Sequence, residues 1–279
     1  MKPQPALFIS HGSPMLVMED SPARRFLTDW RVHHQPPQAI LVASAHWEYR
    51  GGPAVGTAAR PGTVHDFGGF PPALYDIEYP APGAPEIAEK AIHLLREAGY
   101  RVERAESRGL DHGAWAPLIL MYPHAEIPVF QVSLIAGASP REHYRYGSAL
   151  QTLRKQGVLI IGSGSLTHNL YEFMGHARED RAPDWVTEFE FWIERALCEG
   201  RHEELMNYRT LAPYARRNHP TEEHLSPLFF ALGAAGVEAI AAKIHGSHTY
   251  GVLSMDAYQF TADINPSDAS AYLTEKTYG

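Results

Sequence analysis

Residues 39–46 read AILVASAH, a nearly continuous apolar run of strand length that ends on a histidine. The same pattern stands at the start of the chain, where ALFIS at 6–10 is followed by His11. Two further runs of this kind are IPVFQVSL at 127–134 and VLIIG at 158–162. Short, nearly continuous apolar runs are typical of strands that are buried on both faces, as in a parallel sheet. The four runs therefore predict the centre of one sheet.

Longer amphipathic segments alternate with these runs and predict helices. In APEIAEKAIHLLREAG the apolar residues recur at helical spacing, with Pro85 near the start and Gly99 just past the end. Further helices are expected at 139–157, with Ser139 as N-cap, at 183–199, and at 221–235, with Thr221 as cap; strands are expected at 239–246 and 252–260. Alternating strands and helices predict an α/β fold, a single layered domain over residues 1–279 with a mostly parallel or mixed central sheet and helices on both faces.

Composition excludes several classes of partner. The chain has 279 residues and a formal net charge of −8 with no block of basic residues, which argues against binding to nucleic acid or to an anionic membrane. The first residues lack the pattern of a signal peptide and no apolar stretch is long enough to span a bilayer, so we expect a cytoplasmic protein. Because Cys198 is the single cysteine, any metal must be held by His, Asp or Glu side chains.

Three histidines follow predicted strands. His11 and His46 come directly after apolar runs, and His168 lies a few residues beyond the run at 158–162. The carboxyl ends of parallel strands are where open α/β sheets bind ligands, and neutral imidazole is a common ligand of transition metals. One such histidine could equally be hydrogen-bonded to nearby backbone at a strand end. Three together favour a metal centre.

Other histidines remain ambiguous on the residues alone. His65 lies in VHDFGGFP, a Gly-rich aromatic stretch that suits the lining of a pocket or a turn stabilised by Asp66. His112, in GLDHGAWAP, either points into a site or belongs to the cap of a following helix. The stretch around His65, residues 49–83, is rich in Gly and Pro, and loops of that length are usually functional or disordered.

Several longer blocks resemble one enzyme family. SHGSPM, SAHWE, HDFGGFPPALYDIEYPAPG, GLDHGAWAPLILMYP, GSGSLTHNL and PTEEHLSPLFFALGA occur in family order over residues 5–255. Together they resemble the class III extradiol ring-cleavage dioxygenases, and above all their DOPA 4,5-dioxygenase-like branch. The resemblance implies an aromatic ring-opening dioxygenase that inserts O2 into a catechol-type substrate and releases a ring-opened semialdehyde.

The resemblance also implies roles for individual residues. Members of this branch bind a divalent metal through histidines that match His11, His46 and His224. His168 matches a residue that is either a further ligand or the catalytic acid/base, and His112 matches one that contacts substrate or oxygen. From their residue types, and not from the resemblance, we expect the substrate to lie against His65, Phe67 and Trp115. The two aromatic residues could equally belong to the core.

A site of this kind leaves the metal and the reaction open. Related enzymes complete an Fe(II) site with a glutamate, whereas a three-histidine site is also the pattern of catalytic zinc. Fe(II) is expected for dioxygenase activity, and Zn(II) could occupy the isolated protein. The alternatives are a zinc-dependent hydrolase at the same histidines, and a metal- or ligand-binding protein of the same fold with little turnover.

Overall fold

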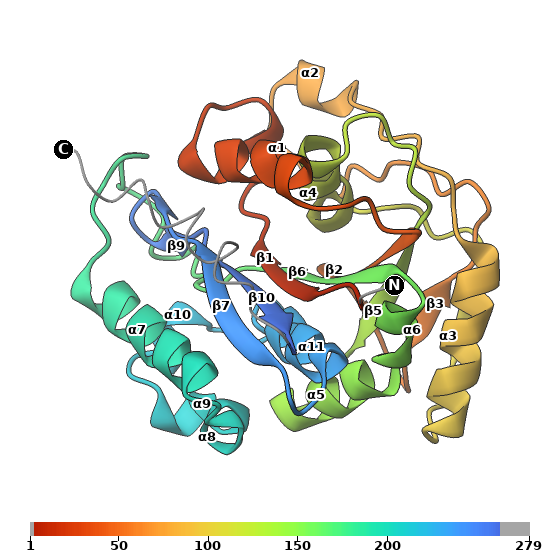
Figure 1. Ribbon diagram of the computed structural model, residues 1–279. Helices are drawn as coiled ribbons and strands as arrows, with labels where there is room; N and C mark the ends of the chain where they lie inside the picture. The colour runs from red at the N-terminus through yellow and green to blue at the C-terminus, as the bar shows by residue number, and fades with distance from the viewer. Residues whose placement is uncertain (1–2, 263–279) are drawn as a thin grey trace.

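The protein was analysed as a computed structural model in which residues 3–262 are described. Each apolar run identified in the sequence forms a strand of one eight-stranded sheet. Figure 1 shows this sheet between two layers of helices. The strands of the sheet are β1 (Ala6–Ser10), β2 (Ala39–Tyr49), β3 (Ala54–Gly56), β4 (Glu103–Ala105), β5 (Val129–Ile135), β6 (Val158–Gly164), β7 (Ile240–His245) and β10 (Ala257–Thr261). A separate hairpin consists of β8 (His248–Thr249) and β9 (Leu253–Ser254).

The strand order across the sheet is β4-β3-β5-β2-β6-β1-β10-β7. The central strands β5, β2, β6 and β1 are mutually parallel, whereas β10 runs antiparallel to β1 and to β7. All residues of β1, β5 and β6 are buried, as expected for strands covered on both faces. The α/β architecture with a mixed, mostly parallel central sheet is therefore confirmed.

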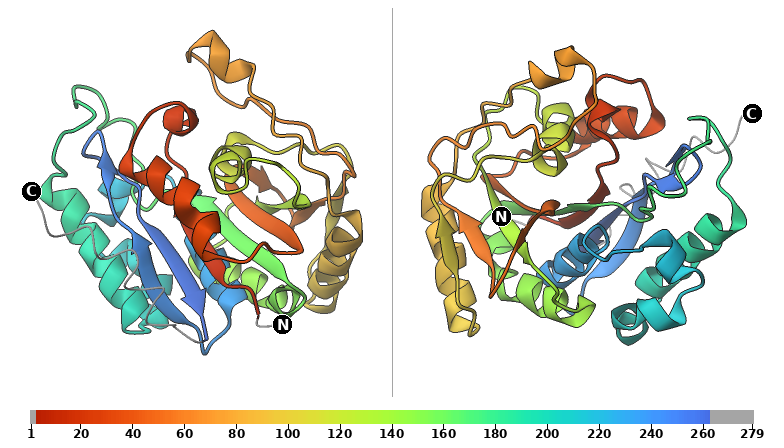
Figure 2. Two further views of the ribbon diagram at one scale, coloured as in Figure 1. Left: turned by 45° about the horizontal axis from the view of Figure 1, so that its top comes forward. Right: turned by 180° about the vertical axis from the view of Figure 1, so that it is seen from behind.

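Two helical layers cover the sheet, and the views in Figure 2 separate them clearly. The first layer packs on Ile40, Val42 and Leu159, and the second packs on Leu41, Ala43 and Ile160. The first layer contains η1 (Pro14–Val17), α1 (Pro22–His33), α2 (Pro72–Tyr75) and α4 (His112–Met121). The second contains α3 (Pro85–Glu97), α5 (Pro140–Ala149), α6 (Thr152–Lys155), α7 (Asp184–Cys198), α8 (His202–Met206), α9 (Tyr208–Leu211), α10 (Ala215–Asn218) and α11 (Ser226–Ala235).

The helix predictions differ in outcome. The segment 84–99 forms α3 and the segment 183–199 forms α7, as predicted. Ser139 caps α5 by accepting a hydrogen bond from the Glu142 backbone, but the predicted helix 139–157 is interrupted between α5 and α6. The start predicted at Thr221 is wrong, because residues 221–225 form turns and α11 begins at Ser226, with Pro227 in its first turn. Pro at that position favours a helix start, and the residues before it are free to adopt another conformation.

The stretch at 49–83 is mostly irregular, with β3 and the short α2 inside it. Among the described residues no helix is both long and apolar enough to cross a membrane. The cytoplasmic location expected from the sequence stays a prediction.

Candidate metal centre

The ends of β1 and β2 bring two histidines together on either side of β6. His11 follows β1 directly, and His46 lies within β2, since this strand continues past the predicted end at Ala45. The pairing of β2 with β5 shifts register between Ala43 and Glu48, so that β2 contains a bulge at His46. The two imidazoles lie with their Nε2 atoms 3.0 Å apart.

Ser163 determines which nitrogen of His11 carries the proton. The Ser163 hydroxyl donates a short hydrogen bond to the Gly113 carbonyl, and its oxygen lies 3.0 Å from His11 Nδ1. A hydroxyl has one hydrogen to donate, so His11 Nδ1–H must be the donor to Ser163. The lone pair of His11 is therefore on Nε2, the atom that faces His46.

Glycine at position 113 lets α4 approach His46 closely. A Cβ atom on Gly113 would lie 2.4 Å from Ser44 Oγ and 3.1 Å from His46 Cδ2. The Ser44 hydroxyl in turn accepts a hydrogen bond from the His46 backbone and donates one to buried Asp111. Asp111 also accepts from Arg108 and from Gln131. This network ties β2, β5 and α4 together beneath His46.

His224 reaches the same place from a distant part of the sequence. Its carbonyl accepts a hydrogen bond from the Ser165 backbone just past β6, and a Cβ atom on Gly164 would overlap that carbonyl. Its Nδ1 lies 2.9 Å from Glu223 Oε1. Although burial raises the pKa of Glu223, the hydrogen bond from His224 lowers it to about 2. Glu223 is then a carboxylate that accepts the proton of His224 Nδ1, which leaves Nε2 of His224 free.

The donor set fits a bound metal ion. One ligand atom from each of His11, His46 and His224 lies within 4.8 Å of the other two. Burial, together with the neighbouring histidines, lowers the pKa of His11 well below its ordinary value and that of His46 to about 2, so both rings are neutral. Between two neutral imidazoles whose Nε2 atoms face each other, either His46 donates from Nε2 to His11 or a cation binds to both nitrogens. Neutral imidazole nitrogens are suitable ligands for divalent transition metals, including Fe(II) and Zn(II).

His112 is the first residue of α4 and lies against His46, with 4.0 Å between the ring centroids. Its Nδ1 donates a hydrogen bond of 2.9 Å to Asp66, and its backbone N–H donates one of 3.0 Å to the same oxygen. Asp66, and not the N-cap residue Asp111, thus caps α4. Although burial raises the pKa of Asp66, the His112 hydrogen bond lowers it to about 2.

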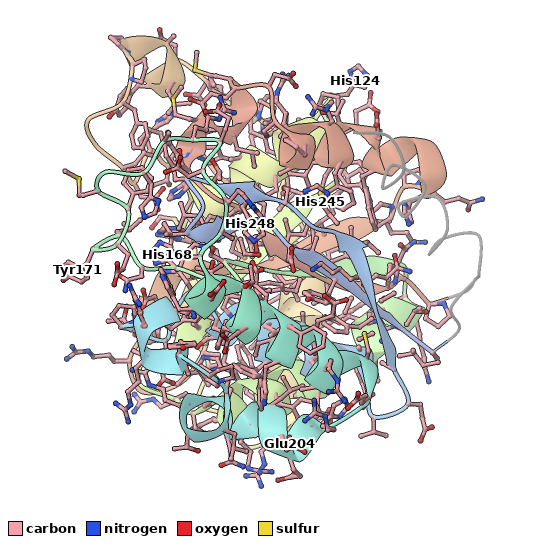
Figure 3. The ribbon with its side chains drawn as sticks, turned by 90° about the vertical axis from the view of Figure 1, so that its left-hand side faces the viewer. His124, His168, Tyr171, Glu204, His245 and His248 are labelled. Atoms are coloured by element: carbon pink, nitrogen blue, oxygen red, sulfur yellow. The ribbon has the colours of Figure 1, made fainter. Side chains whose placement is uncertain are left out.

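His168 stacks on His224 with 3.5 Å between ring centroids and 6° between the ring planes. Burial and the adjacent His224 lower the pKa of His168 to about 3, so its imidazole is neutral. His168 begins a surface loop that carries Tyr171, whose side chain is 89% exposed (Figure 3). Together His11, His46, His112, His168 and His224 form one group of adjacent rings, which we call the histidine cluster.

The predicted substrate-binding residues lie beside this cluster. Phe67 packs edge-on against His112, with 5.6 Å between ring centroids, and lies tilted beside Trp115 at 6.3 Å. His65 donates from Nε2 to the Ile77 carbonyl, and the Trp115 indole donates to the Val64 carbonyl. Trp115 is fully buried, so Phe67 is the member of the trio in contact with the cluster, while His65 and Trp115 hold the loop behind it.

Sequence reasoning did not assign the residues that hold the histidines in place. Ser163, Asp66 and Glu223 each bind an Nδ1 atom, yet the first two come from parts of the chain remote from their partners. The one such residue that the sequence indicated was Glu223, because it directly precedes His224. A cavity of about 610 Å³ is lined by Glu48, Ser139, Arg209 and Glu223, among others, and so reaches that carboxylate.

Comparison with known proteins gives a consistent result. Residues 5–260 match the family described as the catalytic LigB subunit of aromatic ring-opening dioxygenase. The 4,5-DOPA dioxygenase extradiol of Beta vulgaris is 45% identical over 259 residues, covering 91% of this chain and 96% of that protein. The Escherichia coli K12 protein of the same name is 40% identical, with coverage of 91% and 94%. A crystal structure of an uncharacterized protein from Escherichia coli K12 superposes with a TM-score of 0.78 at 33% identity, covering 92% of this chain and 99% of the other.

Proposed function

Because this chain belongs to the LigB family of aromatic ring-opening dioxygenases and is an extradiol ring-cleaving enzyme, we propose that its histidine cluster binds Fe(II) and oxidises a catechol. The observation that carries the proposal is the convergence of His11, His46 and His224. Nδ1 of His11 is hydrogen-bonded to Ser163 and Nδ1 of His224 to Glu223, and Nδ1 of His46 lies 3.6 Å from the Asp66 carboxylate. Such outer partners fix the tautomer and direct Nε2 toward a metal.

We assign the three ligand positions to His11, His46 and His224. A divalent metal bound there would favour the catecholate anion over the neutral catechol and, as Fe(II), would let electrons pass from the catecholate to O2. Zn(II) fits the same nitrogen donors, and the isolated protein is expected to bind it as well. Glu223 acts on the far side of His224 and keeps the ligand oriented.

The proposed substrate is a small substituted catechol of the DOPA type, since the relatives named above are 4,5-DOPA dioxygenases. Both oxygen atoms of O2 enter the product as one ring carbon–carbon bond next to the diol breaks, which leaves an aldehyde and a carboxylate. Phe67 offers an aromatic edge beside His112 against which the catechol ring can pack.

His168 and His112 supply the acid/base chemistry in this proposal. The imidazole of His168 is neutral in the metal-free protein, so its lone pair is open to a catechol hydroxyl. We assign to it the uptake and return of that proton, for which its pKa in the complex must lie nearer neutrality. His112 donates from Nδ1 to Asp66, and its Nε2 is therefore the free acceptor. Since His168 stacks on His224, a further role as ligand is the competing assignment.

The family match favours dioxygenase chemistry over the hydrolase and the binding protein that the sequence left open. The test is to reconstitute metal-free protein anaerobically with Fe(II) or with Zn(II), then to follow O2 uptake and visible absorbance with a panel of catechols. We expect a yellow ring-opened product and O2 consumption with Fe(II) alone. Turnover of carbonyl esters with Zn(II), without O2 consumption under either metal, would instead support the hydrolase.

A further inference from the structure

The carboxylate of Asp66 lies between two rings of the histidine cluster. Its Oδ1 accepts both hydrogen bonds of His112, from the backbone N–H at 3.0 Å and from Nδ1 at 2.9 Å. Its Oδ2 faces the other way and lies 3.6 Å from Nδ1 of the neutral His46 ring, so that the carboxylate charge faces that nitrogen and favours a proton on it. The two oxygens of one side chain therefore serve a candidate metal ligand and a candidate acid/base.

We propose that Asp66 is a positioning residue that orients His46 and His112 together, so that both rings turn Nε2 toward the metal and the substrate. The inference rests on the proposed function, because it assumes that these two Nε2 atoms are the ones used. An imidazole presents a lone pair on Nε2 only when its proton is on Nδ1, and the hydrogen bond at Nδ1 determines this. A carboxylate at Nδ1 accepts and never donates, so it selects that tautomer.

The backbone around Asp66 is fixed well enough for this task. Val64 donates to the Leu110 carbonyl and Leu110 donates to the Gly62 carbonyl, both at 2.8 Å, so the loop pairs with the chain that leads into α4. The Trp115 indole adds a third bond, to the Val64 carbonyl. Asp66 is therefore attached to the element that carries His112, and its position relative to that ring is determined by the backbone.

Two substitutions separate the two halves of the proposal. In Asp66→Asn the amide oxygen can replace Oδ1, where it still accepts both bonds from His112, so the amide nitrogen takes the place of Oδ2. That nitrogen is a donor, which favours a proton-free Nδ1 on His46 and moves the proton of His46 to Nε2. Asp66→Ala removes both contacts.

The experiment reads the tautomers directly. Metal-free protein labelled with 15N-histidine is examined by two-dimensional NMR, with Asp76→Asn as the matched control, since Asp76 is an exposed residue that ends α2. We expect Asp66→Asn to shift His46 to the Nε2–H form and to leave His112 unchanged, whereas Asp66→Ala shifts both. By chelator competition, metal affinity should fall about 10- to 100-fold in both variants and remain unchanged in the control.

At saturating metal concentration, kcat distinguishes a misplaced His112 ring from a loss of bound metal. Asp66→Asn should retain kcat within about threefold because His112 keeps its partner, and Asp66→Ala should lose about tenfold or more. Unchanged His46 and His112 tautomers in Asp66→Ala would overturn the proposal. If that variant does not fold, unchanged metal affinity in Asp66→Asn would overturn it. Because the tautomers are read without metal or substrate, a wild-type protein inactive on catechols would refute the proposed function and leave this readout intact.

Discussion

Two clusters of polar side chains lie beside the same sheet, and they satisfy their hydrogen-bonding atoms in different ways. In the histidine cluster the Nδ1 atoms of His11, His112 and His224 have hydrogen-bond partners in the protein, while the Nε2 atoms of His11 and His46 face each other at 3.0 Å. The second group, which we call the edge cluster, surrounds β7 and β10 and consists of Glu190, Glu194, Lys243, His248 and Asp256. Figure 3 labels His168 of the first group and His248 of the second.

The edge cluster pairs every charge internally. Lys243 Nζ lies 2.6 Å from Asp256 and 3.0 Å from Glu194, and His248 lies 2.8 Å from Glu190. A buried charged group with an opposite charge beside it needs nothing further, whereas the facing Nε2 atoms of two neutral imidazoles are available to bind a cation. The comparison teaches that the charged groups of the edge cluster find their partners within the chain, whereas the histidine cluster has nitrogen atoms that a bound ligand can use.

The largest expected effect comes from His46→Ala. Removing one proposed ligand should abolish stoichiometric metal binding and reduce turnover by about 10³-fold or more, as expected when the metal contribution of several kcal/mol is lost. The free energy of unfolding of the metal-free protein should change by no more than about 1 kcal/mol, since the variant removes one side of a lone-pair contact. Metal analysis, O2 uptake and chemical denaturation check these outcomes, with exposed His93→Ala as control. Full metal content in His46→Ala would contradict the assignment of His46 as a metal ligand.

His168→Ala should come next. If His168 is the acid/base, turnover falls about 10²- to 10⁴-fold while metal content stays stoichiometric. Metal analysis after dialysis distinguishes this role from that of a ligand. A metal content below one ion per protein in the variant would identify His168 as a metal ligand.

Lys243→Met tests the edge cluster. It leaves Asp256, which is 1% exposed, without its closest cation, and should cost about 3 kcal/mol of unfolding free energy at pH 7.5 with unchanged metal content. Burial raises the pKa of Asp256 to about 6, so protonation of this carboxyl should make the loss smaller below that pH. Denaturant titrations at several pH values measure both. A double variant that adds Asp256→Asn should recover much of the loss, and no recovery would contradict the pairing.

Gly113→Ala should have a smaller effect that is confined to the histidine cluster. The new methyl group would contact Ser44 and His46, and the displaced imidazole should bind metal about 10-fold more weakly. Chelator competition measures the affinity. Gly68→Ala, where a Cβ atom meets open space, is the matched control.

The smallest expected effect is the pH dependence contributed by His248. Although burial lowers its pKa, the hydrogen bond and the charge of Glu190 raise it above the ordinary value. The resulting stabilisation is fully present below the unfolded pKa of about 6.5 and is lost as pH rises through the raised folded pKa. His248→Gln should remove a contribution of about 1 kcal/mol at low pH and flatten the stability profile between pH 6 and 8. An unchanged profile would show that the ion pair contributes nothing.

The sequence predicted the central strands well because their apolar runs report a local property, burial on both faces. It predicted that His11, His46 and His168 lie near strand ends for the same reason. His224 and His112 were identified only by resemblance, since His224 is held by contacts with Ser165 and Gly164, some 60 residues earlier. The wrong start for α11 has a related cause: Thr221 bonds to Glu223, so these residues hold His224 instead of extending the helix. Partnerships such as that of Asp66 with His46 depend on the assembled fold, and no spacing in the chain encodes them.

The bulge in β2 has a consequence for how this enzyme can change over evolutionary time. Between the pairs Ala43–Val132 and Glu48–Leu134, β2 advances five residues while β5 advances two. Side chains alternate between the faces of a strand, so deleting one residue here would direct the imidazole of His46 away from α4 and toward α11. A point substitution in this strand displaces the imidazole of His46 by a small amount, whereas a change in strand length removes it from the site. Descendants of this sequence can therefore exchange residues of this segment, outside His46 and its hydrogen-bonded neighbour Ser44, more readily than they can alter the number of residues in it.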